Sequence, residues 1–379
     1  MSGERFDYSN ERQRHDKFVG RAGLLARLDH LLVDSEADRW VVITGGPGMG
    51  KSALLAAWLA RRVAAGAVVP HHFIRRGAYE WDDPAKLVGS LVAQIEDGFP
   101  DLREPHGDER MHPATRLARA LSRVSANVLR PRGERLIVLI DGLDEYDPPA
   151  EPSAGDPFAA FLPDALPAGV RLLCASRPRH AYVSSLDARD GELVQIDLDD
   201  PDHAADNDAT VRAFWEGAAA PLGVDASFVD EAVARAGGNV QHAVQLRKRL
   251  AVLPPEQRRV EDTPRGLAAL IEKSWERIAV DAIVVVGLGI LCAAREALAL
   301  DELAAVAGWT DEARDRGRRV GAAAAVDHLC TLRHEADGGD PAVALQPVPR
   351  RRSAGAGLHG HDVHLQPALA RLVAGARIR

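Results

Sequence analysis

The chain has 379 residues, 46% of them hydrophobic, which suits a globular protein of two or three domains. Its formal net charge of −8 argues against a protein built mainly to coat nucleic acid, although a local basic patch is compatible with it. The three cysteines lie far apart without metal-ligand spacing, and the charged N-terminus has no apolar core of a signal peptide. We therefore expect a cytoplasmic protein with reduced thiols and no membrane association.

A short motif, Phe18-Val19-Gly20-Arg21, follows a polar leader and precedes leucines at helical spacing. The helix is expected to pack against the fold that follows. Val19 and Arg21 are candidate contacts to a nucleotide, through adenine or ribose. The residue types alone do not separate this role from that of a buried anchor.

A glycine-rich loop carries the strongest chemical signal. The apolar run that ends at Thr44 predicts a strand, and Lys51-Ser52 open a helix rich in alanine and leucine. Between them the pattern G-x-x-x-x-G-K-[ST] is complete, and its members are Gly45, Gly46, Pro47, Gly48, Met49, Gly50, Lys51 and Ser52. Such a loop holds phosphate through backbone N–H groups, with lysine on the β- and γ-phosphates and serine on Mg²⁺. We therefore predict a bound nucleoside triphosphate with Mg²⁺.

A second signal is an apolar run, 136–140, that ends in Asp141 and continues as Gly-Leu-Asp-Glu. The run predicts a central parallel strand buried on both faces, and ligands bind at the carboxyl ends of such strands. Asp141 is thus expected to hold Mg²⁺ opposite Ser52, and Asp144 or Glu145 to position the attacking water. The alternative is an acidic surface turn.

A further buried strand is predicted at 171–176, with Arg177 directly after it. An arginine there can sense a γ-phosphate through its planar fork of donors. The structural alternative is an ion pair between Arg177 and a carboxylate of the Asp144-Glu145 turn. A last strand of the sheet is expected at 193–198.

Helical patterns dominate from 206 onwards, with a Gly-Gly-Asn turn at 237–239. Beyond a charged linker, the segment from 265 to 332 has a helix-turn-helix rhythm. The last segment is basic in an otherwise acidic chain. We interpret it as a disordered basic tail or as the product of a reading-frame shift.

Together the Phe-Val-Gly-Arg motif, the glycine loop, the Asp141-Gly142-Leu143-Asp144-Glu145 strand end and Ser176-Arg177-Pro178 resemble the STAND class of P-loop NTPases, and its NACHT branch in particular. The resemblance spans about residues 18–332. It implies a helical lid and a winged helix after the sheet. It also implies ATP or ADP as the bound nucleotide and self-association that depends on ATP. An effector or sensor protein as partner, and signalling of the kind used in stress or antiviral defence, are further implications of the resemblance.

The resemblance and the patterns predict an α/β fold, with a parallel P-loop NTPase sheet sandwiched by helices, an α-helical lid and a winged-helix domain. The expected segments are 1–39 (leader and first helix), 40–200 (NTPase domain), 201–256 (lid), 257–335 (winged helix) and 336–379 (tail).

Two other functions compete with a slow ATPase that serves as a switch. A winged-helix transcription regulator would bind DNA through clustered basic residues, and Arg314, Arg316, Arg318 and Arg319 supply some of them, diluted by neighbouring acids. A phosphotransferase is disfavoured because no acceptor-binding insertion is visible.

Overall fold

The computed structural model describes residues 6, 8, 18–35, 39–75, 81–103, 111–146, 156–178, 183–187, 189 and 192–278, and short pieces beyond them. The chain forms two compact units, Met1–Thr210 and Val211–Arg379.

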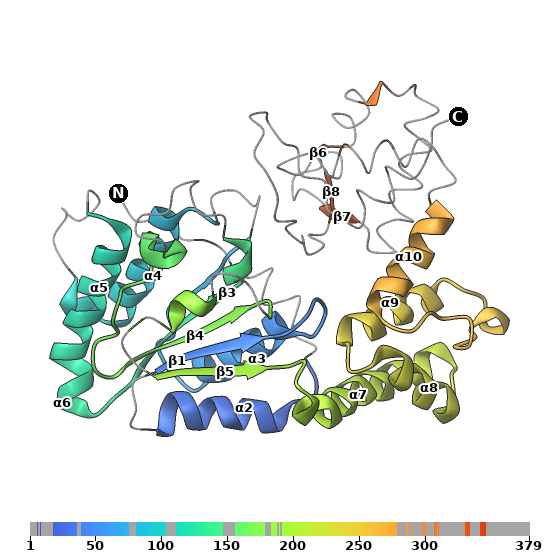
Figure 1. Ribbon diagram of the computed structural model, residues 1–379, viewed down its shortest axis with the longest axis horizontal. Coiled ribbons are helices and arrows are strands. Elements are labelled where there is room, and N and C mark those ends of the chain that lie inside the picture. Colours follow the sequence, from blue (N-terminus) through green and yellow to red (C-terminus); the bar gives the residue numbers. More distant parts are fainter. Residues whose placement is uncertain are drawn as a thin grey trace. The chain divides into compact units, whose positions relative to one another are not determined.

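Five parallel strands form one sheet in the first unit, in the order β2-β3-β4-β1-β5 (Figure 1). Their registers pair Thr44 with Ser176 and with Asp197, and Phe73 with Asp141. The carboxyl ends of the strands therefore meet at one edge of the sheet. The strands are β1 (Arg39–Thr44), β2 (His71–Phe73), β3 (Leu136–Asp141), β4 (Val170–Ser176) and β5 (Glu192–Asp197). The predicted parallel sheet is confirmed.

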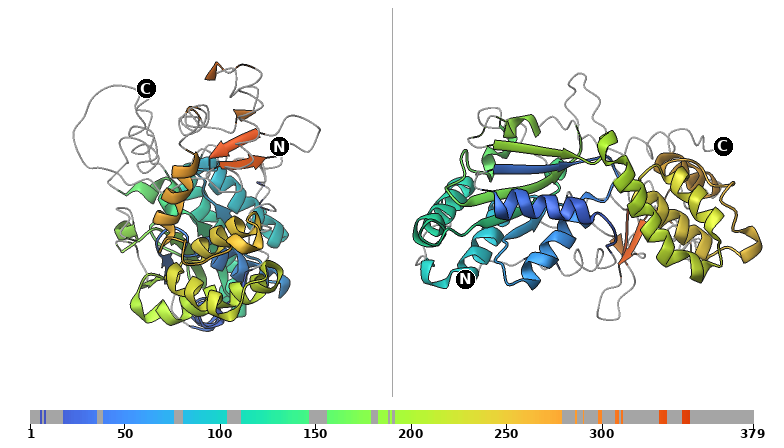
Figure 2. Two further views of the ribbon diagram at one scale, coloured as in Figure 1. Left: turned by 90° about the vertical axis from the view of Figure 1, so that its right-hand side faces the viewer. Right: turned by 90° about the horizontal axis from the view of Figure 1, so that it is seen from below.

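Helices cover both faces of this sheet (Figures 1 and 2). Alternate residues of β3 belong to two different cores, because successive side chains of a strand point to opposite faces. Leu136, Val138 and Ile140 pack with side chains of α4 and α5, whereas Ile137 and Leu139 pack with those of α2 and α3. The main helices of this unit are α2 (Ala22–Asp29), α3 (Lys51–Ala64), α4 (Pro84–Gly98) and α5 (Pro113–Val124).

Shorter helical turns complete the first unit. A π-helical turn, η1 (His30–Asp34), extends α2, and another, η4 (Ser125–Leu129), joins α5 to α6 (Arg130–Arg132). The buried Arg171 on β4 donates to the carbonyls of Leu31 and Ser35, which ties the end of η1 to the sheet. The 3₁₀ turns are η2 (Pro100–Leu102), η5 (Leu143–Glu145), η7 (Pro157–Ala160), η8 (Val183–Leu186) and η9 (Pro201–His203).

The strands predicted at 136–140, 171–176 and 193–198 are present as β3, β4 and β5, whereas β2 covers only three residues, His71–Phe73. Pro70 has no N–H to donate, so the ladder of β2 begins at His71. The carbonyl of Pro70 still accepts from the N–H of Leu139, at 2.9 Å. At the start of α4, Asp83 caps the helix by accepting from the N–H of Lys86 at 2.9 Å.

Part of the polar leader packs on β2. Tyr8 is 4% exposed, and its hydroxyl lies 2.6 Å from Nδ1 of His72 and 3.3 Å from Oγ of Ser90. Nε2 of His72 lies 2.8 Å from the carbonyl oxygen of Trp81. A carbonyl can only accept, so Nε2 carries the proton and Nδ1 accepts from Tyr8. Burial lowers the pKa of His72 to about 4, and the imidazole is neutral at pH 7.

Helices make up the described part of the second unit as far as 278. They are α7 (Ala204–Leu222, which begins in the first unit), α8 (Ala226–Ala236), α9 (Val240–Ala251), η10 (Pro255–Gln257) and α10 (Leu267–Ile278). Asp225 and Asn239 cap α8 and α9, and Gly237 ends α8 in the left-handed conformation. The predicted Gly-Gly-Asn turn therefore ends one helix and begins the next.

Beyond 278 the described pieces include three short strands. β8 (Ala342–Leu345) pairs antiparallel with both β6 (Leu298–Ala299) and β7 (Cys330–Arg333). The strand β8 lies in the predicted disordered tail, where pairing on both sides supplies hydrogen bonds to a short apolar run. Most of the predicted winged helix and the rest of the tail lie outside the described residues.

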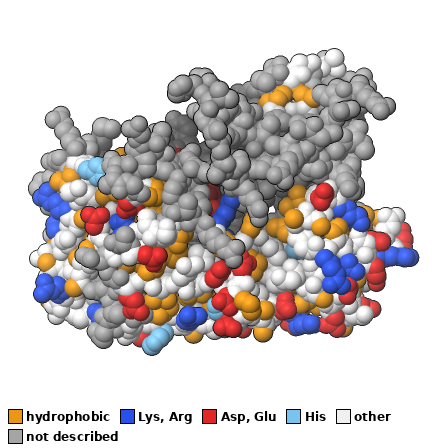
Figure 3. Space-filling model, in the orientation of Figure 1, with side chains coloured by type: hydrophobic (Ala, Val, Ile, Leu, Met, Phe, Trp, Pro, Cys, Tyr) orange, Lys and Arg blue, Asp and Glu red, His pale blue; other side chains and the backbone are white. Residues whose placement is uncertain are grey.

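The described surface is mixed in charge. In the view of Figure 3, acidic and basic side chains are interspersed over the described residues. Among the described helices, none is long and apolar enough to cross a bilayer.

The first prediction concerns acid stability. Between pH 6.5 and about 4 the unfolded chain binds a proton at His72 and the folded chain does not, so stability falls as the pH is lowered through this range. The free energy of unfolding is expected to be about 3 kcal/mol lower at pH 4 than above pH 6.5, where His72 is neutral in both states and causes no loss. Urea unfolding from pH 4 to 7 measures it, and His72→Gln is expected to flatten the profile. The exposed His30, changed to glutamine, is the control. An unchanged slope in His72→Gln would contradict the assignment.

The second prediction concerns Gly142, which follows β3 with φ 81°. A Cβ there would lie 2.8 Å from the carbonyl oxygen of Ile74, whereas a Cβ at Gly133, with φ 63°, meets nothing within 4 Å. Gly133→Ala is thus expected to cost about 1 kcal/mol of unfolding free energy from backbone strain alone, and Gly142→Ala about 3 kcal/mol. Equal midpoints of chemical unfolding for the two variants would show that the close approach to Ile74 has no energetic effect.

Candidate nucleotide site

The glycine-rich loop joins β1 to α3, as the sequence predicts. Gly48 and Gly50 have φ values of 81° and 79°, a conformation that favours glycine and turns the backbone around an anion. Helix α3 begins at Lys51, and its N-cap residue, Gly50, has no side chain to cap the first turn. The N–H groups at this helix start are therefore available to phosphate, and the positive end of the helix dipole adds to the attraction.

Lys51 lies among backbone carbonyl groups and close enough to carboxylates for them to influence its charge. Its Nζ donates to the carbonyl oxygens of Gly45 and Gly46, at 2.6 and 3.1 Å. Burial lowers the pKa of Lys51, and the carboxylates of Asp144 and Asp141 oppose that shift. A partly desolvated ammonium attracts a phosphate more strongly than the same group does in water, because the effective dielectric constant is lower.

Asp199 is a residue of the candidate site that the sequence patterns did not predict. Its Oδ2 accepts from the N–H of Gly46 at 2.7 Å, which places a carboxylate beside the loop expected to hold phosphate. The signal that could have revealed it is the acidic end of β5, where Asp197 closes the strand and Asp199 and Asp200 follow it. Its carboxylate also opposes the lowering of the pKa of Lys51.

The strand ends bring Asp141 to the face of the sheet that α3 covers. Ile137 and Leu139 on β3 belong to the core under α3, and Asp141 continues the same alternation. Asp141 is 1% exposed and ends β3, one strand away from β1. The interposed strand is β4, so Arg177, just after its end, lies between the loop and the acids.

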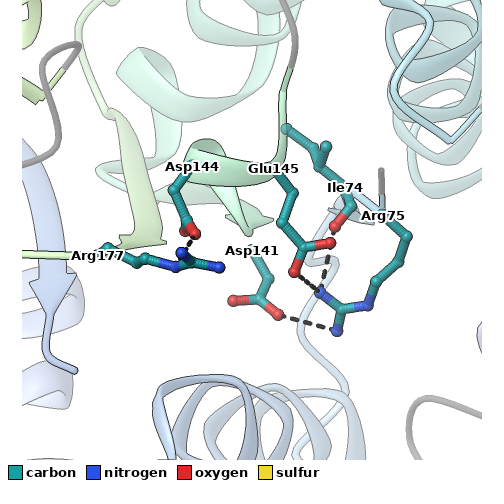
Figure 4. A network of polar contacts seen from close by, with 6 residues as sticks. All are labelled: Ile74, Arg75, Asp141, Asp144, Glu145 and Arg177. Carbon is teal, nitrogen blue, oxygen red and sulfur yellow. Dashed lines mark hydrogen bonds and ion pairs between the residues drawn. The ribbon is translucent and has the colours of Figure 1, made fainter. Parts of the chain in front are cut away.

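Two arginines pair with the three predicted acids (Figure 4). Nε of Arg177 lies 2.7 Å from Oδ2 of Asp144. On the other side, Nη2 of Arg75 lies 3.3 Å from Oδ2 of Asp141, and its Nη1 lies 3.2 Å from Oε1 of Glu145. The pairing of Arg177 is the structural alternative that the sequence left open, and Arg75 is a second participant that the sequence analysis missed.

The residues present suit a nucleotide with Mg²⁺. Ser52 is the second residue of α3 and is half-buried, and Asp141 ends β3, so α3 offers a hydroxyl and β3 a carboxylate at the same edge of the sheet. Hard oxygen donors of this kind are the ligands that Mg²⁺ prefers. Roles for Asp144, Glu145 and Arg177 in the reaction remain predictions.

The Val19-Gly20-Arg21 turn lies against the same loop. Arg21 is 4% exposed and is the only described residue other than glycine with a positive φ, of 55°. Its guanidinium donates to the carbonyl oxygens of Met49 and Gly50 and, at 3.0 Å, to Oδ1 of Asn207. Val19 is 37% exposed. Arg21 thus holds the loop itself, and direct nucleotide contacts by Val19 and Arg21 remain predictions.

Comparison with known proteins agrees with this geometry. Residues 17–173 match the family model described as an AAA ATPase domain. None of the curated proteins matches the chain.

Several solved structures are similar at low identity. They include Drosophila ORC bound to DNA (14% identity, 91% of this chain and 90% of that chain, TM-score 0.40), Aeropyrum pernix ORC2 in ADPNP-ADP complexes (13%, 89% and 94%, 0.42) and a Thermotoga maritima RuvB mutant (13%, 89% and 92%, 0.32). Likeness at this level carries no argument about function. The domain match at residues 17–173 and the glycine-rich loop do not depend on these structures, and together they show that this chain carries a P-loop NTPase domain.

Proposed function

We propose that this chain is an ATP-driven switch that hydrolyses ATP slowly. The observation that carries the proposal is the convergence on one sheet edge of a glycine loop, a half-buried lysine and a strand-end acid, within a segment that matches an AAA ATPase domain. Mg²⁺, when bound, would neutralise charge on the phosphates and orient them for attack by water.

Each side chain has a role in this proposal. Lys51 and the N–H groups of the loop bind the β- and γ-phosphates, and Ser52 and Asp141 hold the metal ion. Asp144 or Glu145 orients the attacking water and takes up its proton. Arg177, now paired with Asp144, would turn to the γ-phosphate, since a guanidinium can form bidentate pairs with a phosphate as well as with a carboxylate.

The contacts of Arg21 support a switch. Arg21 holds the carbonyl groups of Met49 and Gly50 and also binds Asn207, near the start of α7. Nδ2 of Asn207 donates in turn to the carbonyl of Leu198, at 2.7 Å. A displacement of the loop on binding phosphate would therefore act on α7, which continues past Thr210 as one helix.

One contact is too weak to drive the switch alone. To move an equilibrium from about 1:99 to 99:1 requires roughly 5.5 kcal/mol of differential affinity. A hydrogen bond to a charged group supplies about 1.5 to 3 kcal/mol. Arg177 must therefore act together with other groups, and Arg21 and Asn207 are suitably placed.

The finer assignment to a STAND switch of the NACHT type rests on the sequence motifs. It predicts self-association in the ATP state and an effector or sensor partner. No described observation favours DNA binding, and the arginines at 314–319 on which that alternative depends lie outside the described residues.

The third prediction tests the loop. Lys51→Ala removes the only side-chain cation within the loop, so nucleotide binding is expected to weaken at least about a hundredfold, the equivalent of two hydrogen bonds to a charged group. Titration with a fluorescent ATP analogue measures this, and Lys86→Ala, on α4, is the matched control. Retained binding by Lys51→Ala would overturn the proposed function.

The fourth prediction separates binding from turnover. Glu145→Gln and Asp144→Asn keep the loop and Asp141, so both are expected to bind ATP, and the one that removes the base is expected to lower phosphate release by about a hundredfold or more. Light scattering after size-exclusion chromatography, in ADP and then in ATP, shows whether the slowed variant self-associates. A monomer in both nucleotides would argue against the oligomeric switch.

A further inference from the structure

Arg75 joins two acids of the site through one guanidinium. Its Nη2 contacts Asp141 at 3.3 Å and its Nη1 contacts Glu145 at 3.2 Å (Figure 4). The side chains of Arg75 and Asp141 are 17% and 2% exposed, so this ion pair is poorly screened by water. A buried carboxylate requires a compensating charge, and Arg75 supplies one through this ion pair.

The backbone fixes the position of the fork. The N–H of Ile74 donates to the carbonyl of Asp141 at 2.9 Å, and Nη1 of Arg75 donates to the carbonyl of Ile74 at 3.1 Å. Gly142 permits this approach, because a Cβ there would lie 2.8 Å from the oxygen of Ile74 and 3.5 Å from Nη1 of Arg75. A lysine, with one ammonium in place of a planar fork, cannot reproduce the bridge.

The bridge conflicts with metal binding. Asp141 is the carboxylate expected to hold Mg²⁺, and a guanidinium that donates to its Oδ2 competes for the same lone pairs and repels a dication. Glu145 has no such conflict, since it is expected to act on water. The contact between Nη2 of Arg75 and Asp141 therefore has to break when the metal ion binds, whereas the contact between Nη1 and Glu145 can remain.

We propose that Arg75 is a positioning residue that holds Asp141 and Glu145 in the metal-free state and releases Asp141, but not Glu145, when Mg²⁺ arrives with the nucleotide. This inference rests on the proposed function. Arg75 then sets the Mg²⁺ concentration that nucleotide binding requires. It also holds Glu145, a candidate base, in place with and without the metal ion.

The fifth prediction measures this competition without relying on turnover. Binding of a fluorescent ATP analogue is followed while Mg²⁺ is titrated from an EDTA baseline. Because Arg75→Gln removes the competing cation, half-saturation is expected at about tenfold less Mg²⁺, the equivalent of one hydrogen bond to a charged group. Unchanged or increased Mg²⁺ demand would overturn the proposal.

Two further variants keep the test decisive. Arg75→Lys retains a charge, so it should fold even if Arg75→Gln does not. The Mg²⁺ concentration at its half-saturation is expected to lie between those of wild type and Arg75→Gln. A value equal to that of wild type would contradict the bridge. Arg103→Gln is the matched control, since Arg103 also joins two carboxylates, those of Asp97 and Glu96, at an exposed site after α4. If wild type binds no nucleotide at any Mg²⁺ concentration, the proposed function itself fails.

Discussion

The desolvated charge of Lys51 is the constraint on which the site depends. An ammonium out of water is costly, and the protein offsets the cost with the carbonyls of Gly45 and Gly46 and with the carboxylates of Asp144 and Asp141. The acids in turn need cations, which Arg177 and Arg75 provide. The strand ends thus hold a connected set of charges rather than isolated catalytic groups.

The strand order makes this arrangement possible. Because β4 lies between β1 and β3, the ends of three successive strands deliver a phosphate loop, an arginine and an acid, side by side. Side-chain alternation then decides the face, since Asp141 continues the row of Ile137 and Leu139 beneath α3. A shift of β3 by one residue would turn its carboxylate toward α4 and α5, away from the loop.

The local parts of the site could be predicted from the sequence. The loop and Asp141 each follow a buried strand directly, so residue type and position along the chain are sufficient to assign them. Arg75 and Asp199 were missed because their partners lie far away in the sequence, and an arginine or an acid after a strand is common. The contacts of the Arg21 side chain could not be predicted either. They depend on the left-handed backbone of Arg21 and on Asn207, 186 residues further along the chain.

The paired acids imply how a nucleotide would change the protein. Asp141, Asp144 and Glu145 each have a cationic partner, so a triphosphate with its metal ion would enter a set of existing pairs and exchange partners with them. Such an exchange favours two discrete arrangements over a continuous adjustment, because a half-exchanged state leaves a desolvated charge without compensation. The guanidinium of Arg21 contacts both the loop carbonyls and Asn207 in the first turn of α7, so a displacement of the loop would disturb its contact with α7.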